Sequence, residues 1–525
     1  MGKALGTILS IAVAVFAPYA AAALGLTGFA ATAFGFVAQG LVGKLVGGSS
    51  LFGGGQQGAG TQDSGLLLNQ QSTSEPVYII YGERRIGGNR VYINTTNGSG
   101  DVSGNEYLHS AFTISEGEVG WINAVLLQGN IAWIHPKIID DPDNVYFAAD
   151  EETDFATWQG KYDAQGRAKT YSSLMSLSLY RGTETQNWDD AWYQTESDYA
   201  WFSDEITGDF SGAGIAWAYL RLQYDRDKFP GAPNVQFDVV GKRIYNLIDT
   251  DDDLDPFDNK VLARNDTWEN LKSDLLIYKN PANVLHDYLT NSRYGKGLSE
   301  SVFNGFEFAA LRTYTYNKGL EVNGALDPQS KIFDNTQLIL NTANAFLVYS
   351  QGKYGPKPLA ELVYDEDTYL FNEDNILGDW NISLGSKRNK QNKIKINYFN
   401  PLQNWQRDII TFPEDDLTNP YLIADNNVVN ERQIDLPLTS EARQASAIGE
   451  FLLKVSRYQD VVSFKTTWDA LRLQVGDPVY VTHPRPGWIN QPFRVVGITL
   501  QQDGTVDVTL LEYPDTDVWI PDHTY

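Results

Sequence analysis

Hydrophobic and polar positions divide the chain into an apolar head and a longer body. The sequence has no Asp, Glu, Lys or Arg between Lys3 and Lys44, which is a hydrophobicity typical of membranes. Pro18 and repeated glycines interrupt this run, so residues 1–50 are predicted to form short helices with small-residue faces. The large apolar side chains that we expect to plug a lumen or enter a membrane are Leu9, Val13, Phe16, Leu24, Phe29, Phe34, Phe36 and Val37.

The head also resembles a secretory signal peptide, because Lys3 precedes an apolar run and an Ala-rich stretch at residues 20–23. The apolar run continues well beyond that stretch, and we therefore expect the mature chain to keep it. Residues 51–75 are rich in Gly, Gln and Ser and show little periodicity, which predicts a flexible linker.

Residues 76–248 have the pattern of a β module. Short apolar runs end at Gly or Asn, and the first two, at 77–81 and 91–93, predict a hairpin. Further strands are expected near 111–114, 121–127, 216–223 and 235–244. Residues 140–210 are acidic and aromatic with weak alternation, and they are interpreted as an insertion or extended loop.

Residues 249–375 have the pattern of an α/β module. Asn280 can cap a helix that begins at Pro281, and apolar residues then recur on one helical face. A second helix is expected around 303–311, and a third over 334–344 before a strand at 345–349.

Residues 376–525 return to β-type alternation around one amphipathic helix at 441–458, capped by Thr439 or Ser440. The predicted strands lie at 393–399, 461–467, 478–482, 493–500 and 505–511. The predicted fold class is therefore α+β and mainly β, with two antiparallel β modules flanking an α/β module.

Composition limits the partners of this body. Among 525 residues, 40 Lys and Arg stand against 66 Asp and Glu, which gives a net charge of −26. Such a surface repels phosphate backbones, so sequence-specific binding of nucleic acid is not expected. The chain has no cysteine, which excludes disulfides and thiolate sites and suits assembly in a reducing cytoplasm.

Candidate chemistry is sparse, and no cofactor is predicted. Asp249, Asp251 and Asp253 have the first spacings of an EF-hand calcium loop, but Leu254 and Lys260 occupy positions that need Gly and Glu. An acidic linker is therefore favoured over a calcium site. The five histidines are not spaced as a metal pair, and neither a nucleophile elbow nor a P-loop occurs. A glycosidase, which needs only two converging carboxylates, stays an open alternative, because the 66 acidic residues offer many pairs.

Several motifs, in the same order, resemble the central tail-tip hub proteins of long-tailed bacteriophages, the lambda-like host-attachment protein among them. The longest is NPANVLHDYLTNSRYGKG at 280–297. The others are PVYIIYGERRIGG at 76–88, SEGEVG at 115–120, VGKRIY at 240–245, NGALD at 323–327, FLVY at 346–349, GKY at 352–354 and GDPV at 476–479. The resemblance covers about residues 76–515.

The resemblance implies a homotrimer at the distal tip of the virion tail, with two tube-like modules per chain that form a ring of six. It also implies three partners: the distal tail protein, the tape-measure protein and tail fibre or tip proteins. DNA would pass through the lumen, and no catalytic site is expected. Lambda-like members continue into a receptor-binding region that is not matched here, so direct receptor recognition is not expected.

Two other classes of function remain as alternatives. The apolar head could anchor a surface enzyme whose acidic, aromatic cleft acts on glycans, with a pair of carboxylates at its centre. A bacterial adhesin is disfavoured, because the sequence shows no internal repeats. The favoured hypothesis is a structural hub whose head packs near the threefold axis or against the tape-measure protein; contact of the head with the host membrane during DNA delivery is a further hypothesis.

Overall fold

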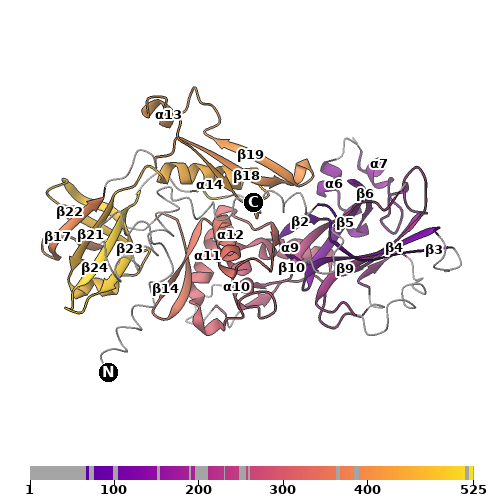
Figure 1. Ribbon diagram of the computed structural model, residues 1–525, viewed down its shortest axis with the longest axis horizontal. Helices are drawn as coiled ribbons and strands as arrows, with labels where there is room; N and C mark the ends of the chain where they lie inside the picture. The colour runs from indigo at the N-terminus through magenta and orange to yellow at the C-terminus, as the bar shows by residue number, and fades with distance from the viewer. Residues whose placement is uncertain are drawn as a thin grey trace.

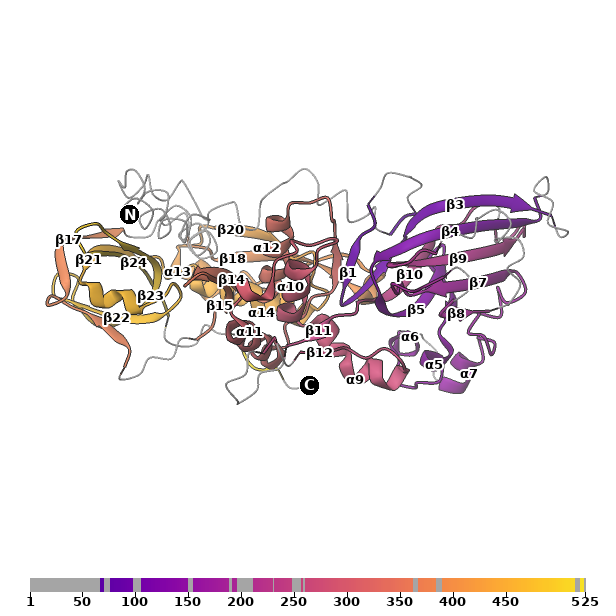
Figure 2. The ribbon, with the colours of Figure 1, turned by 90° about the horizontal axis from the view of Figure 1, so that it is seen from below.

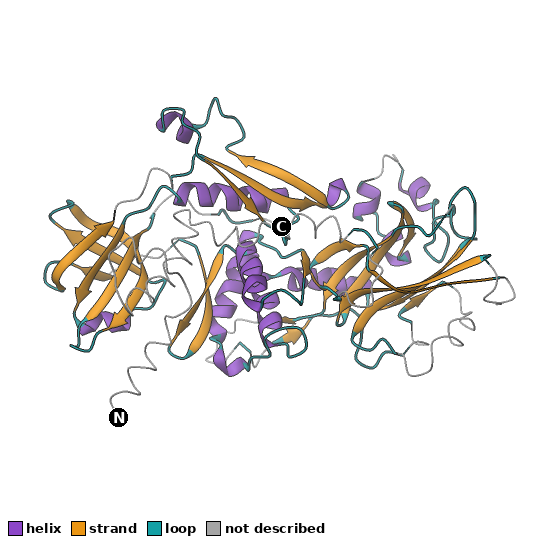
Figure 3. Ribbon diagram, in the orientation of Figure 1, coloured by secondary structure: helices purple, strands orange, loops and turns teal. Residues whose placement is uncertain are grey.

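The computed structural model describes the chain from residue 67 onwards with gaps; the described ranges are 67–69, 76–97, 105–149, 154–187, 191–195, 211–229, 231–247, 256–257, 260–361, 367–383, 390–514 and 520–523. The apolar head and the candidate calcium residues Asp249, Asp251 and Asp253 lie outside these ranges, so both stay predictions. The described body is elongated, with β-rich modules at its two ends and helices between them (Figure 1). The predicted class, α+β and mainly β, is confirmed (Figure 3).

The first β module is a sandwich of two antiparallel sheets whose inner faces share one apolar core. One sheet has the strand order β2 (Glu83–Ile86), β10 (Val235–Lys242), β5 (Val119–Leu127) and β6 (Asn130–Ile134). The other has the order β3 (Asn89–Thr96), β4 (Tyr107–Glu116), β9 (Ile215–Gln223), β7 (Met175–Tyr180) and β8 (Tyr193–Gln194). We call the shared apolar residues the sandwich core, and its members include Phe112, Ile122, Val125 and Phe237.

Strand β5 is buried along its whole length because both of its faces are covered. One face joins the sandwich core, and the other packs beneath helices through Trp121 and Leu126. Figure 2 shows these helices along one side of the module; they are α5 (Pro136–Ile139), α6 (Val145–Ala148), α7 (Phe155–Gln159) and α9 (Trp268–Lys279). Burial on both faces explains why residues 121–127 are apolar on both faces of the strand, with Asn123 as the exception.

Two expectations for this module are wrong. Residues 77–81 and 91–93 do not form a hairpin, because β1 (Ile79–Tyr81) pairs with β13 (Gly324–Leu326) and β3 pairs with β4. Nor are residues 140–210 only a loop: β7 pairs with β9 within the five-stranded sheet. The observed strand pairings join segments far apart in the chain, and local alternation of apolar and polar residues does not reveal them.

The central module consists of three main helices and a hairpin. Helices α10 (Pro281–Thr290), α11 (Gly305–Lys318) and α12 (Ile332–Thr342) pack around one core, and β14 (Ala345–Ser350) pairs with β15 (Lys353–Pro358). The predicted start of α10 is confirmed: Asn280 Oδ1 accepts hydrogen bonds from the backbone N–H groups of Ala282 at 3.0 Å and Asn283 at 3.5 Å. A short ladder of β11 (Tyr245–Asn246) and β12 (Val261–Leu262) and a 3-10 turn, η1 (Glu300–Val302), complete this region.

The rest of the chain forms two separate β units. In the first, α14 (Ala442–Val455) packs on a sheet with the order β19 (Gln406–Phe412), β18 (Lys393–Asn400) and β20 (Glu431–Asp435). The predicted helix is confirmed, but the predicted cap is wrong. Glu441 is at the N-cap position and makes no side-chain capping bond.

The second unit is a six-stranded sheet that curls towards closure at one end of the molecule (Figure 1). Its order is β16 (Tyr369–Phe371), β22 (Pro478–His483), β23 (Trp488–Leu500), β24 (Val506–Glu512), β21 (Val461–Thr466) and β17 (Ile376–Ser383). Trp380 on β17 stacks on His483 of β22 with ring centroids 3.6 Å apart. Strands near opposite edges of the sheet therefore meet, as in a barrel.

Candidate assembly site

A small projection stands out from the β18–β19–β20 sheet. Residues 413–430, which we call the lobe, connect β19 to β20 and contain the short helix α13 (Pro420–Ala424). In Figure 1, α13 stands away from the body of the molecule. Asn419 begins this helix: its Oδ1 accepts hydrogen bonds from the backbone N–H groups of Tyr421 at 3.0 Å and Leu422 at 3.1 Å.

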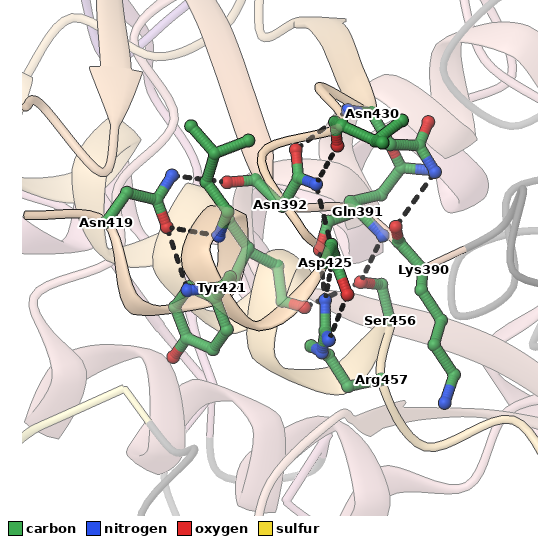
Figure 4. Close-up of polar contacts among 12 residues, drawn as sticks. Lys390, Gln391, Asn392, Asn419, Tyr421, Asp425, Asn430, Ser456 and Arg457 are labelled. Atoms are coloured by element: carbon green, nitrogen blue, oxygen red, sulfur yellow. Dashed lines mark hydrogen bonds and ion pairs between the residues drawn. The ribbon is translucent and has the colours of Figure 1, made fainter. Parts of the chain in front are cut away.

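One buried amide holds the lobe to the sheet (Figure 4). Asn392, which has no solvent exposure, donates from Nδ2 to Asp425 Oδ2 at 3.0 Å and to the Val428 carbonyl at 2.8 Å. Its Oδ1 accepts the backbone N–H of Asn430 at 2.8 Å, and its carbonyl accepts Asn419 Nδ2 at 2.8 Å. Asn392 thereby fixes four points along the lobe, three through its side-chain amide and one through its backbone carbonyl.

A bidentate ion pair ties the lobe to the end of α14. Arg457 Nη1 and Nη2 donate to the two oxygens of Asp425, each at 2.9 Å (Figure 4). Hydrogen bonds from Arg457 hold the pKa of Asp425 below its usual value. We call Asn392, Asn419, Asp425, Asn430 and Arg457 the polar clamp.

The polar clamp is suited to positioning rather than to proton transfer. Asp425 is kept ionised, and both of its oxygens already accept hydrogen bonds from Arg457 and Asn392. A general acid or base needs a proton-exchanging atom aimed at a reactant and a pKa near the working pH. Asp425 has neither, so this arrangement fixes the shape of the lobe.

A second cluster joins the first β module to the β18–β19 hairpin, and we call it the module junction. The guanidinium of Arg84 on β2 lies 3.9 Å from the ring centre of Phe399 and 5.3 Å from that of Trp405. Beside it, Arg85 forms a bidentate pair with Asp238 of β10, with N–O distances of 2.6 and 2.8 Å. Arg84, Arg85 and Asp238 are all buried, so the contact is desolvated.

A partly buried lysine links the central module to β2 of the first β module. Lys279, at the end of α9, lies 2.6 Å from Glu83 and 3.5 Å from Glu321. Burial lowers the pKa of Lys279, but the two carboxylates outweigh that effect and raise it overall. The lysine is therefore charged, and removing one of its partners would leave a partly buried charge that is poorly compensated.

The structure places four of the five histidines in separate surroundings. Burial lowers the pKa of His135 and of His286 to about 4, so both are neutral at pH 7. His109 is buried between Thr96 and Tyr219, and His483 stacks on Trp380. In the part of the chain that the structure describes, no group of three or more His, Asp or Glu side chains could hold a metal ion.

Sequence reasoning missed the polar clamp, although one signal was present. Asn419-Pro420 has the same helix-start pattern as Asn280-Pro281, which was recognised. The remaining members lie as far apart in sequence as Asn392 and Arg457, and only the fold brings them together.

Parts of the chain resemble known proteins. Residues 357–498, which contain the whole polar clamp, match a family described as putative phage tail protein. The baseplate hub protein pb3 of Escherichia phage T5 is 25% identical over 262 residues, which are 45% of this chain and 27% of pb3. These matches support a relationship of the chain to phage tail proteins and baseplate hub proteins. The match to pb3 spans about a quarter of the length of pb3.

A similar fold occurs in a solved structure. A chain in the virion of a native gene transfer agent particle superposes with a TM-score of 0.56 at 16% identity, over 94% of this chain and 96% of the other. The resemblance seen in the sequence motifs is confirmed, and the protein is assigned to the virion tail. Within the described ranges, no helix combines the length and the apolar character needed to cross a bilayer.

Proposed function

We propose that the protein is a structural hub at the distal end of the tail. Three copies would close the tail tube, and the ring would open to deliver DNA into the host. The observation that carries this proposal is the match to baseplate hub protein pb3. The contact of buried Arg84 with Phe399, which joins two β-rich regions, supports it, because a ring component needs rigid connections between its modules.

The proposed partners are the distal tail protein, the tape-measure protein and tail fibre or tip proteins. With a net charge of −26, the protein would line a conduit that repels DNA rather than retaining it. We expect no covalent chemistry at the hub. The matches described above give no support to the alternative, a membrane-anchored enzyme that acts on glycans.

The oligomeric state of the purified protein tests this proposal. Mass photometry is expected to show a trimer, and negative-stain electron microscopy a ring with threefold symmetry. A monomer at micromolar concentration that hydrolyses a glycan, with activity abolished by one Asp or Glu substitution, would contradict the hub and favour the enzyme.

The apolar head has its own test. We propose that residues 1–50 pack near the threefold axis or against the tape-measure protein at rest, and contact the host membrane during DNA delivery. The intact protein is expected to float with liposomes in a density gradient, because the head has no charge between Lys3 and Lys44, whereas a version without residues 1–50 should not. Equal flotation of the two proteins would remove membrane contact from the proposal.

A further inference from the structure

The lobe exposes four large apolar side chains. Leu417, Ile423, Val428 and Val429 are 88, 57, 67 and 58% exposed. Their neighbour Leu422, on the same helix α13, points inward and is buried. The helix therefore has one side chain that anchors it and another that is presented to the surroundings.

The polar clamp keeps this apolar surface from collapsing onto the body. Asn392 binds the lobe at both ends of α13, through Asn419 before it and Asp425 and Val428 after it. Arg457 then fixes Asp425 to the end of α14. A surface that is already ordered loses little conformational entropy when a partner binds, which favours docking.

The charged residues of the lobe itself are all of one sign. Between residues 413 and 431 the chain has five carboxylates, Glu414, Asp415, Asp416, Asp425 and Glu431, and no Lys or Arg. Three of them are neutralised by neighbours outside the lobe: Asp425 by Arg457, Asp416 by Lys393 at 2.8 Å and Glu431 by Lys395 at 3.0 Å. Glu414 and Asp415 have no ion-pair partner among the described residues.

We propose that the lobe is a docking surface for a different tail protein, whose contact face is apolar and flanked by Lys or Arg. This inference rests on the proposed function, because it requires neighbours in a tail. Lys or Arg side chains of the partner would pair with Glu414 and Asp415, while its apolar residues cover Ile423 and Val428. Glu414 and Asp415 disfavour nucleic acid, anionic lipid and the equally acidic lobe of a second copy.

Photo-crosslinking in assembled tails identifies the occupant. The full-length protein carrying p-benzoylphenylalanine in place of Ile423 is incorporated into tails, irradiated, and analysed by mass spectrometry. The expected adduct is with another tail protein, at a position close to Lys or Arg. An adduct with a second copy, with residues 1–66 of the same chain, or no adduct in tails that contain the protein would overturn the proposal.

A pair of variants measures the effect on assembly. Ile423→Asp/Val428→Asp adds charge to the apolar surface, and Val145→Asp is the matched control, because Val145 is 69% exposed on α6 in the first β module. The lobe variant is expected to give at least roughly tenfold fewer complete tails, and the control a normal number. Normal tail assembly by the lobe variant would overturn the docking surface.

The two proposals fail in different ways. If the lobe variant forms the same trimer as the unaltered protein but is not incorporated into tails, the hub and the docking surface are both supported. If the unaltered protein forms no ring, the hub itself fails. If the lobe variant is misfolded by circular dichroism, the crosslink at position 423 decides the docking surface alone.

Discussion

The sandwich core and the lobe are both held in one conformation, but by opposite kinds of interaction. Phe112, Ile122 and Phe237 are completely buried among apolar side chains contributed by both sheets. Of the lobe's residues, all of which the structure describes, only Asn419 and Leu422 are buried. Apolar burial is non-directional and scales with area, whereas amide and guanidinium hydrogen bonds specify a geometry. The comparison of these two regions teaches that directional hydrogen bonds can hold an exposed projection in one conformation without an apolar core of its own.

The largest expected effect comes from a cavity in the sandwich core. Phe237→Ala should lower the free energy of unfolding by about 3–5 kcal/mol, because the side chain is fully buried and its ring lies 5.7 Å from that of Phe112. Equilibrium denaturation would measure this, with Val145→Ala expected to change stability by less than about 0.5 kcal/mol. Equal losses of unfolding free energy in the two variants would show that the sandwich core does not stabilise the fold more than an exposed position does.

Removing the central amide of the polar clamp should have a smaller and more local effect. Asn392→Ala leaves the Asn430 N–H and the Val428 carbonyl without their partner, at a cost of roughly 1–3 kcal/mol. Hydrogen exchange of the lobe amides should become about tenfold faster or more, while that of β5 stays unchanged. Asn317→Ala, at an exposed position of α11, is the control. Equal acceleration in β5 would contradict the independence of the two regions.

Acidification should weaken the lobe while the apolar sandwich core is little affected, and this is the smallest of the three effects. Arg457 lowers the pKa of Asp425 in the folded protein, relative to about 3.9 in the unfolded chain. A depressed pKa means that the ion pair stabilises the fold above about pH 4, and that this contribution is lost as the pH falls through the lower, folded pKa. The protection of the lobe amides against hydrogen exchange, corrected for the intrinsic exchange rate, should therefore fall as the pH is lowered below about 4.

Asp425→Asn is the control for the pH effect. This variant should show weaker protection of the lobe at neutral pH and little further change on acidification, because the titrating group is gone. An unchanged acid response in the variant would assign the effect to another group.

The sequence was informative wherever a structure depends on neighbours along the chain. Asn280-Pro281 predicted the start of α10, and the amphipathic pattern predicted α14. The ordered motifs also predicted the relationship to tail hubs, because a family resemblance is carried by the residues themselves. Net charge and the absence of cysteine limited the function before any contact was known.

Only the tertiary structure decided which distant segments meet. It paired β1 with β13 and β7 with β9, and it placed Arg84 on the ring of Phe399. It also gathered the polar clamp from three separate stretches of chain around Asn392. Local patterns report burial and capping, since these depend on residues a few positions apart. Long-range pairing and directional hydrogen bonds depend on the whole fold, because each needs two partners whose positions are set independently along the chain.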